Sequence, residues 1–247
     1  MSKCLIISGG EFTPGLFNSN FIKSLEYTHV YAADKGIIYA HKMGIVPDAV
    51  IGDFDSLSDY INLTSSLDDH ESISVNKYLN IAQNVVDSLF GERSKNIKIL
   101  THPVKKDDTD TMLAIKAALD DGANEIYIIC ALGGRIDHTF ANIQSLNYIA
   151  SHNAIGHIYS KDEHLSILKG PFSETISRKE GYSLSLYSIS DMSKGLTIKG
   201  TLYEVDNIDL TNSFPLAYGN KITENKARIS LSEGNLLIIE SKIGGGN

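Results

Sequence analysis

The stretch that decides the fold is EIYIICALGGRIDH, residues 125–138. An apolar run leads into two glycines, and a helical pattern of apolar residues follows them. A strand that is apolar along its whole length is buried on both faces, as in a parallel sheet covered by helices. This stretch predicts a strand over Glu125–Ala131, a tight turn, and a helix over His138–Ala150.

The same alternation of strand and helix runs through the first 152 residues. Met112, Ile115 and Leu119 are spaced three and then four apart, which gives a helix one apolar face. The alternation predicts a three-layer α/β/α domain with a mostly parallel sheet over residues 1–152. The other predicted strands are Cys4–Ser8, His29–Ala33, Ala49–Ile51 and Ile97–Leu100, and the other predicted helices are Leu16–Glu26, Gly36–Met43, Tyr78–Phe90 and Thr109–Asp120.

The hydrophobic period changes after residue 152. Tyr182, Leu184 and Leu186 alternate with serines, and glycine-containing turns separate successive apolar runs. Alternation of this kind places one face of a strand on a core and the other in water. Residues 153–247 therefore predict an antiparallel β-sandwich or barrel, without a helix.

Composition narrows the classes of function. The 247 residues are 42% hydrophobic and 21% charged, with a net charge of −8, which argues against a nucleic-acid groove. No apolar run approaches the roughly 18–20 residues that span a bilayer, and the first residues lack the apolar core of a signal peptide. Cys4 and Cys130 lie in apolar runs, so we expect no disulfide, a cytoplasmic location and small-molecule partners.

The first acidic cluster, Asp53 and Asp55, follows the predicted strand Ala49–Ile51. Ligands of open parallel sheets bind at the carboxyl ends of strands. If this segment is extended, the two carboxylates point the same way, and Mg²⁺ is the cation that suits paired oxygen ligands. The alternative is an Asp-rich turn in which Ser56 caps a helix.

The second cluster, residues 105–110, directly precedes the helix predicted from Thr109. Asp107 and Asp110 are three apart, and a first helical turn would bring them to one side. The segment has more acceptors than capping needs, and its two lysines suit a phosphate chain with its cation. The alternative is that Asp and Thr only cap the helix and complement its dipole.

The third cluster is the turn from Gly133 to His138. Adjacent glycines permit positive φ and close approach of a ligand, and the following helix N-terminus can hold a phosphate. Arg135 can bind a phosphate through two hydrogen bonds. The alternative is a tight turn with Asp137 as the N-cap and His138 as a polar residue of the first turn.

Taken together, GDFDS (52–56), KDDTD (106–110) and GGRIDHTFAN (133–142) resemble the motifs of the thiamine pyrophosphokinase family. The resemblance implies an α/β domain followed by a β-sandwich, and transfer of pyrophosphate from ATP to the thiamine hydroxyl, which gives thiamine diphosphate and AMP. It also implies Mg²⁺, ATP as co-substrate, and a homodimer whose active sites lie between the N-terminal domain of one subunit and the C-terminal domain of the other.

The resemblance also assigns roles to single residues. The catalytic acids that hold Mg²⁺ are Asp53, Asp55 and Asp110. The residues that contact ATP are Asp34, Ser56, Lys106, Arg135 and His138, of which Arg135 is also catalytic. The residues that contact the acceptor are Lys106, Asp107, Thr109, Asp137 and Asn220. An acidic pocket around Asp137 would attract the thiamine cation, and the general base stays open between Asp55 and Asp110.

The chain departs from the family pattern in its second half. Gly195-Leu196 continues without the usual aromatic residue and Pro-Leu, Asn220 alone remains of a later motif, and the chain has no Trp. The residues that either stack on thiamine or belong to the sandwich core are Tyr203, Phe214 and Tyr218. The 49 residues between Ser56 and Lys106 are long for the family, and the helix Tyr78–Phe90 is interpreted as an insertion.

Three alternative functions remain. The altered second half admits the same transfer to a different alcohol. A non-catalytic sensor of nucleotide or thiamine diphosphate would keep the same acidic clusters. DFDSL, residues 53–57, also resembles the start of a metal-dependent phosphatase or a D-x-D glycosyltransferase.

Overall fold

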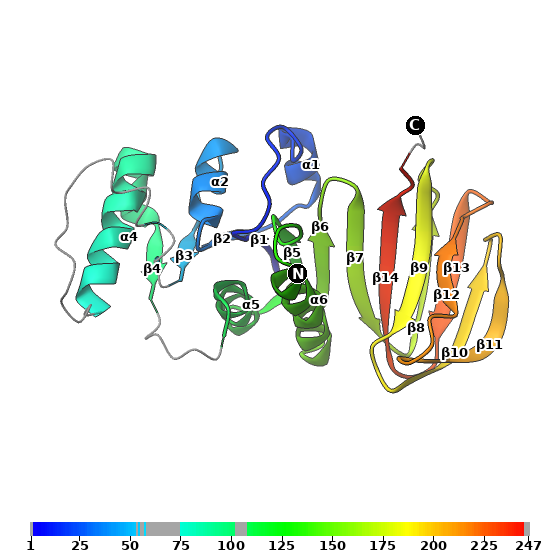
Figure 1. The fold of residues 1–247 in the computed structure, drawn as a ribbon. Coiled ribbons are helices and arrows are strands. Elements are labelled where there is room, and N and C mark those ends of the chain that lie inside the picture. The colour runs from blue at the N-terminus through cyan, green and yellow to red at the C-terminus, as the bar shows by residue number, and fades with distance from the viewer. Residues whose placement is uncertain (1, 53, 55–56, 58–74, 102–107, 245–247) are drawn as a thin grey trace. The chain divides into compact units, whose positions relative to one another are not determined.

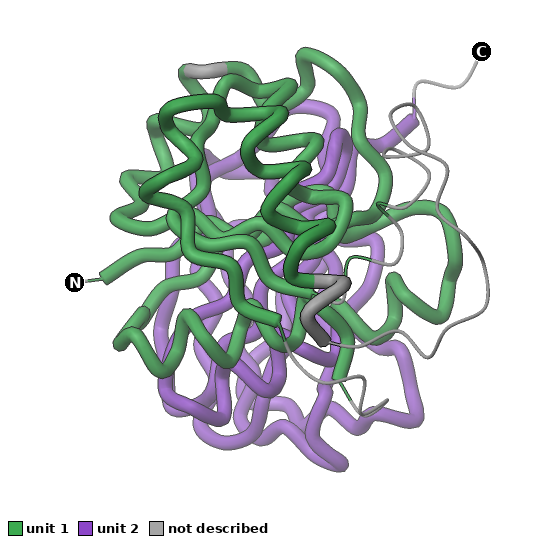
Figure 2. The backbone as a smooth tube through the Cα atoms, turned by 90° about the vertical axis from the view of Figure 1, so that its left-hand side faces the viewer, with its two compact units in different colours: residues 1–142 green, residues 143–247 purple. Residues whose placement is uncertain are grey.

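A computed structural model of the chain describes residues 2–52, 54, 57, 75–101 and 108–244. The chain divides into two compact units, Met1–Asn142 and Ile143–Asn247, and the division falls inside helix α6 (Ile136–Ser151) (Figure 2). No helix among the described residues is long and apolar enough to cross a bilayer.

The first unit is built on a parallel sheet in the strand order β5-β1-β2-β3-β4. The strands are β1 (Ser2–Ile7), β2 (His29–Ala33), β3 (Ala49–Ile51), β4 (Lys98–Leu100) and β5 (Ala123–Ile129). Because β5 pairs with β1, the chain moves outward from β1 to β4 and then returns to the other side of β1. Such an order gathers the carboxyl ends of β1, β2, β3 and β5 at one edge.

Helices cover both faces of this sheet. They are α1 (Ser19–Ser24), α2 (Gly36–Lys42), α4 (Val75–Phe90), the short 3₁₀ helix η2 (Gly91–Asn96) and α5 (Asp110–Asp120). Figure 1 shows α1, α2 and α4 on one side of the sheet and α5 on the other. Right-handed crossovers produce this arrangement when the chain reverses its direction across the sheet. The predicted α/β fold with a parallel sheet is confirmed.

Helix α4 belongs to the core of the first unit. Its residues Ala82, Val86 and Phe90 pack in one buried cluster with α2, with β2 and β3, and with Phe54 and Leu57. Full burial of a large apolar side chain stabilises the fold by about 1.5–3 kcal/mol. The helix interpreted as an insertion is thus an integral part of the packing.

Local chemistry moves three predicted boundaries. Helix α1 starts later than predicted, because Asn18 is its N-cap and its side chain accepts a hydrogen bond of 2.9 Å from the Phe21 N–H. Strand β5 ends at Ile129, because Cys130 has φ of 57°. Helix α6 begins at Ile136, so the interpretation of Asp137 as its N-cap is wrong.

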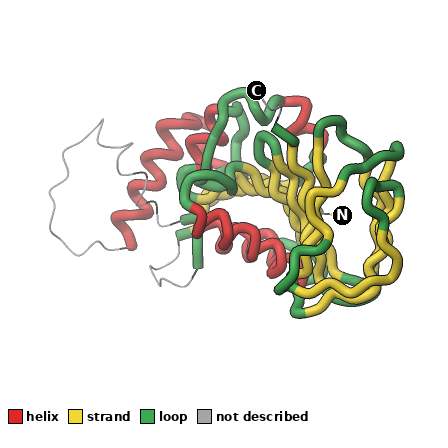
Figure 3. Tube along the Cα trace, turned by 45° about the vertical axis from the view of Figure 1, so that its right-hand side comes forward, coloured by secondary structure: helices red, strands yellow, loops and turns green. Residues whose placement is uncertain are grey.

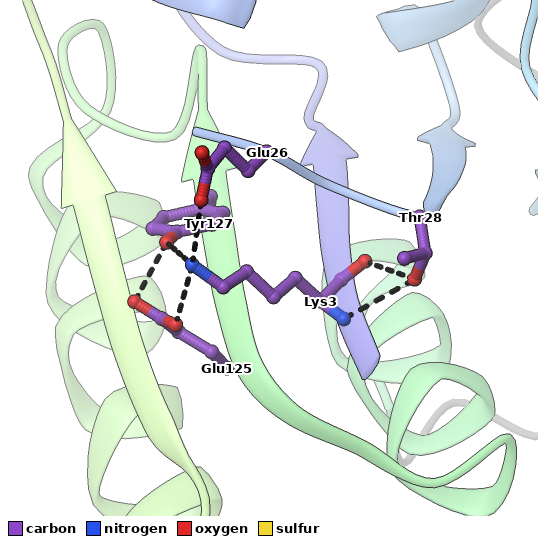
Figure 4. Close-up of polar contacts among 5 residues, drawn as sticks. All are labelled: Lys3, Glu26, Thr28, Glu125 and Tyr127. Carbon is purple, nitrogen blue, oxygen red and sulfur yellow. Dashed lines mark hydrogen bonds and ion pairs between the residues drawn. The ribbon is translucent and has the colours of Figure 1, made fainter. Parts of the chain in front are cut away.

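A polar cluster ties the amino ends of β1 and β5 together (Figure 4). Lys3 Nζ lies 3.2 Å from the Glu125 carboxylate, 4.0 Å from Glu26 and 3.3 Å from the Tyr127 hydroxyl. Tyr127 in turn donates a 2.6 Å hydrogen bond to Glu125, and burial together with this bond raises the tyrosine pKa. These charged groups hold the edge of the sheet opposite to the strand ends where ligands bind.

The second unit is antiparallel after α6 ends (Figure 3). One sheet has the order β12-β9-β14-β7-β6, and the other has the order β11-β10-β13-β8. The strands are β6 (Ile155–Tyr159), β7 (Glu163–Lys169), β8 (Phe172–Ser177), β9 (Tyr182–Ser188), β10 (Met192–Lys199), β11 (Val205–Thr211), β12 (Ala217–Asn220), β13 (Lys226–Leu231) and β14 (Asn235–Lys242). The predicted antiparallel fold is confirmed.

Alternate side chains of these strands form one apolar core. Leu184 and Leu186 of β9 pack with Ile198, Ile229 and Ile238 from the neighbouring strands. Since the contributing strands belong to both sheets, the core fills a sandwich rather than one exposed sheet face. Because alternate side chains of each strand enter this core, hydrophobic residues recur at every second position after residue 152.

The second unit also buries a carboxylate. Glu240 on β14 contacts His164 Nδ1 at 2.7 Å and Lys179 Nζ at 3.1 Å, and the His164 Nε2 lies 3.1 Å from His157 Nδ1. Burial raises the pKa of Glu240, but the His164 hydrogen bond and the Lys179 charge outweigh it, so the net shift is downward. Burial lowers the pKa of His164 against the opposing effect of Glu240.

We expect this cluster to make stability fall in acid. Because the pKa of His164 in the folded chain lies below 6.5, the unfolded chain binds the proton first as the pH falls, and the stabilisation present above 6.5 is lost. Glu240 adds a further loss below 4.5, and each unit of pKa difference is worth about 1.4 kcal/mol. Urea unfolding at pH 7.5 and 5.5 measures the first effect.

The variants His164→Gln and His152→Gln form a matched pair for this test. His152 is exposed, so its replacement should leave the pH dependence of unfolding as in the wild type. His164→Gln should reduce that dependence between pH 7.5 and 5.5. Equal dependence in all three proteins would contradict the assignment to His164.

Candidate active site

Strained backbone gathers at the carboxyl ends of the parallel strands. Asp34 follows β2, Phe54 follows β3 and Cys130 follows β5, with φ of 50°, 60° and 57°. Among the described residues, six non-glycine residues have positive φ, and half of them are these three. Such conformations cost about 1–3 kcal/mol each and cluster at ligand and catalytic sites. This edge of the sheet is therefore the first candidate for a site.

Each of two glycines at this edge faces a carboxylate. A Cβ atom built on Gly52 would lie 3.2 Å from Oδ1 of Asp110 and 3.5 Å from the backbone nitrogen of Asp34. A Cβ atom built on Gly9 would lie 3.1 Å from Oδ2 of Asp34. The Asp34 N–H also donates a 3.0 Å hydrogen bond to the Ile51 carbonyl, which fixes the turn after β2. The ends of β1, β2 and β3 thus share one acidic corner with the start of α5.

The predicted metal ligands Asp53 and Asp55 lie outside the described residues. Phe54, between them, is fully buried and has φ of 60°, so the condition that this segment is extended does not hold at its central residue. The side chains of the described residues contain no group of three His, Cys, Asp or Glu placed to hold a metal ion. Ser56, Lys106 and Asp107 also lie outside the described residues.

The start of α5 fixes the position of Asp110. Thr109 is the N-cap, and its Oγ1 accepts a 3.2 Å hydrogen bond from the Met112 N–H. The capping interpretation is thus confirmed for Thr109, and the helix begins at Asp110. That Asp107 and Asp110 lie on one side stays a prediction, because Asp107 is outside the described residues. The neighbouring Asp108 pairs with Lys116 at 2.6 Å and belongs to the helix surface.

The turn between β5 and α6 lies beside the chain that leaves β1. The Gly10 N–H donates to the Cys130 carbonyl at 2.8 Å, and the Glu11 N–H donates to the Leu132 carbonyl at 3.3 Å. Gly133 has φ of 88°, and a Cβ atom there would overlap the Glu11 carboxylate. The predicted positive φ of this glycine turn is confirmed, and the group that approaches it closely is the side chain of Glu11.

Arg135 and Asp137 face one another across the first turn of α6. Arg135 Nε lies 3.1 Å from Oδ1 of Asp137, and Nη2 lies 2.5 Å from Oδ2. The hydrogen bond from Arg135 lowers the pKa of Asp137, and the His138 N–H adds a bond of 3.0 Å to the same carboxylate. Both side chains are exposed, so their ion pair contributes little stability and can exchange for a phosphate.

In the second unit, Asn220 uses every hydrogen-bonding position of its amide inside the protein. Its Oδ1 accepts from the N–H groups of Tyr203 and Lys221, at 3.0 and 2.9 Å. Its Nδ2 donates to Thr201 Oγ1 and to the Tyr203 carbonyl, at 3.2 and 2.7 Å. Since two lone pairs and two N–H bonds are all that an amide offers, Asn220 holds the turn that carries Tyr203.

The aromatic residues considered for stacking are on the surface of the second unit. The side chains of Tyr203, Phe214 and Tyr218 are 66%, 65% and 63% exposed. Their interpretation as sandwich core is therefore wrong. Leu202 and Leu216, neighbours of these residues in sequence, are also exposed, so residues 202–218 carry five large exposed apolar side chains.

Sequence reasoning missed the segment after β1. Ser8 forms a buried hydroxyl contact with Thr111 at 2.6 Å, and the Tyr39 hydroxyl donates to the Gly10 carbonyl at 3.1 Å. The Phe12 ring stacks on Tyr39 at a centroid distance of 4.8 Å. The signal was an apolar strand followed by Gly9-Gly10, the same pattern that singled out the turn after β5.

Residues 23–156, more than half of the chain, match the family model of the thiamin pyrophosphokinase catalytic domain. The chain belongs to the thiamine pyrophosphokinase family. It is therefore an ATP-dependent diphosphotransferase, and the reaction of this family transfers pyrophosphate from ATP to the hydroxyl of thiamine. The phosphatase and glycosyltransferase hypotheses find no support in this match.

Relatives of known name extend the likeness to the whole chain. Thiamine pyrophosphokinase of Bacillus subtilis (strain 168) is 25% identical over 221 residues, which cover 87% of this chain and 88% of the relative. Its solved structure superposes with a TM-score of 0.73 at 23% identity, over 98% of this chain and 99% of that one. The enzyme of Candida albicans gives 0.61 at 17% identity, over 98% and 89%. The shared fold spans both units.

Replacing Gly52 by Ala should damage this family's site. The new Cβ would face Asp110 at 3.2 Å on a backbone with φ of 152°, so the carboxylate has to shift. We expect kcat/KM for AMP formation to fall by about 10–100-fold, as when the support of a metal ligand is lost. Gly44→Ala is the matched control, because its φ is 71° and its Cβ meets no described atom within 4 Å. Full activity of Gly52→Ala would contradict the proposed corner.

Proposed function

We propose that this chain makes thiamine diphosphate and AMP from thiamine and ATP at the acidic corner of residues 34, 52 and 110, with Mg²⁺ held by Asp53, Asp55 and Asp110. The observation that carries the proposal is that the Asp110 carboxylate lies 3.2 Å from where a Cβ atom of Gly52 would stand. Gly52 directly precedes Asp53 in the chain, which supports Asp53 and Asp110 as ligands of one cation.

The residues of this corner fit a hard divalent cation. Carboxylate oxygens are the ligands that Mg²⁺ prefers, and it is usually bound by one or two of them together with phosphate oxygens. When bound, the ion would neutralise charge on the phosphates and on the leaving AMP. Asp34 adds a further negative group beside Gly9, which raises the repulsion that a cation relieves.

The phosphates of ATP lie between this corner and the start of α6. Arg135 releases Asp137 and binds a phosphate through its two parallel N–H groups, while Lys106 and His138 add positive charge and hydrogen bonds. The N-terminus of α6, a helix of 16 residues, favours the same anion. Ser56 and Asp34 complete the contacts to ATP.

The acceptor is held by acids and oriented for transfer. Asp137, once released from Arg135, attracts the thiamine cation, and Lys106, Asp107 and Thr109 border the reacting hydroxyl. Either Asp55 or Asp110 takes the proton from that hydroxyl. Holding the hydroxyl in line with the phosphate contributes most to rate in reactions of this type. Asn220 serves the acceptor by fixing the turn of Tyr203 rather than by direct contact.

A homodimer completes the site. We assign residues 1–152 to ATP and Mg²⁺, and residues 153–247 to thiamine and dimer formation, with each site shared between two subunits. Exposed apolar side chains of residues 202–218 support an interface there, because monomers rarely expose such groups together. Both thiols, Cys4 and Cys130, are unpaired and buried, and burial raises the Cys130 pKa to about 12, which suits a reducing cytoplasm.

Transfer to a different alcohol is the second candidate. The chain has no Trp, and three separate aromatic side chains, Tyr203, Phe214 and Tyr218, stand exposed instead. Three separate single rings offer a different stacking surface to the acceptor than one indole does. The nucleotide product is the same in both cases, so only the acceptor separates them.

Asp110→Asn should abolish most turnover. We expect the wild type to form AMP and thiamine diphosphate only when ATP, Mg²⁺ and thiamine are all present. Loss of one metal ligand should lower kcat by at least about 100-fold, the upper end of what loss of a supporting residue costs. Asp108→Asn, which removes the adjacent carboxylate that pairs with Lys116, is the matched control and should keep its activity.

Product identity separates the competing functions. Release of ADP would contradict pyrophosphoryl transfer. AMP formed with another alcohol but not with thiamine would establish the second candidate. Calorimetric binding of ATP with no AMP over hours would establish a sensor.

A further inference from the structure

A buried pair of hydroxyl groups lies directly behind the acidic corner. Ser8 Oγ and Thr111 Oγ1 are 2.6 Å apart, and the two residues are 3% and 7% exposed. They are 103 positions apart in the sequence. The contact joins the residue that follows β1 to the first turn of α5.

Ser8 is itself anchored to the sheet. Its N–H donates a 3.0 Å hydrogen bond to the Ile129 carbonyl at the end of β5. Ser8 therefore links the start of α5 to the ends of β1 and β5. Water does not compete for the donor and acceptor of a buried hydrogen bond, so the geometry of that bond is well defined.

Asp110 lies between two fixed neighbours. On one side Thr109 caps the helix by accepting from the Met112 N–H, and on the other side Thr111 bonds to Ser8. The carboxylate of Asp110 then reaches Gly52 at the end of β3. Where this carboxylate stands relative to β3 depends on where the first turn of α5 is held.

Further along α5 the buried side chains are apolar, and at its C-cap Asp121 accepts a hydrogen bond from the Tyr31 hydroxyl of β2. Ala114, Ile115 and Ala118 are buried on the helix, and Leu5, Ile6 and Ile7 are buried on β1. Apolar packing is non-directional and tolerates small shifts and rotations of a helix. A hydrogen bond between hydroxyls, in contrast, has a preferred distance and direction. The Ser8–Thr111 pair is a directional contact between the first turn of α5 and the residue that follows β1.

We propose that Ser8 and Thr111 are positioning residues for the divalent cation: they hold the Asp110 carboxylate at Gly52 without touching the cation. The inference rests on the proposed function, because it takes Asp110 as a Mg²⁺ ligand. A Val at position 111 has nearly the shape of Thr but no hydroxyl. The helix would keep its apolar packing in that variant and lose the contact that sets the place of Asp110.

Calorimetric titration of Mg²⁺ into protein that holds α,β-methylene-ATP tests this without turnover. In this analogue a carbon replaces the oxygen of the bond to be broken. We expect Thr111→Val to raise the Kd for Mg²⁺ about tenfold, the lower end of the effect of supporting residues at metal sites. Thr111→Ser keeps the hydroxyl and should bind as the wild type does.

Ser188→Ala is the matched control. Ser188 and Ser193 form the corresponding buried hydroxyl pair of the second unit, at 2.8 Å. Its loss should lower the free energy of unfolding in urea and leave the Kd for Mg²⁺ unchanged. Ser8→Ala should repeat the effect of Thr111→Val, and the double variant should be no weaker than either single one, because one contact is lost in all three.

The outcomes separate the inference from the function. Wild-type protein that binds no Mg²⁺ with the analogue would overturn the proposed function. Tight binding by the wild type and equally tight binding by Thr111→Val would overturn the inference alone. An equal rise of Kd in Ser188→Ala would also overturn it, because the effect would then be general. If Thr111→Val does not fold, Ser8→Ala, which removes one atom, decides the question by the same measurement.

Discussion

Repulsion between carboxylates at one edge of a parallel sheet is the constraint on which this site depends. Asp34 lies close to Gly9, and Asp110 lies close to Gly52. Gly52 directly precedes Asp53 in the chain, and Asp55 follows two residues later. Negative charges placed together are costly unless a cation lies among them. The strand order β5-β1-β2-β3 and the left-handed residues after three strands bring Asp34 and Asp110 to this edge, where the proposed cation would offset the repulsion between carboxylates.

The structure gives several polar residues a different task from contact with ligands. The Asn220 side chain stabilises a turn, the Thr109 side chain caps a helix, and Arg135 forms an ion pair with Asp137. A catalyst of phosphoryl transfer works mainly by positioning, and these internal bonds supply that precision. The Arg135–Asp137 pair differs from the other two because both side chains are exposed, and an exposed ion pair contributes little stability.

The order of strands and helices could be predicted from the sequence, because burial of one face of a helix or strand gives its apolar residues a regular spacing. Thr109 as a cap and the glycine turn after β5 were also predictable from local chemistry. The left-handed φ of Phe54 was not, because a bulky residue takes that conformation only where the surrounding core compensates for it. Neither was the Ser8–Thr111 contact, since two isolated hydroxyls far apart in the chain leave no pattern. The pairing of Arg135 with Asp137 follows from the turn geometry, which their spacing alone does not set.

The most direct test is a crystal structure of the protein with Mn²⁺ and α,β-methylene-ATP, in which anomalous scattering locates the ion. The account predicts a peak within about 2.0–2.3 Å of a carboxylate oxygen of Asp110, shared with the acids that follow Gly52. A peak that is bound elsewhere, with Asp110 several ångströms from the ion, would contradict it.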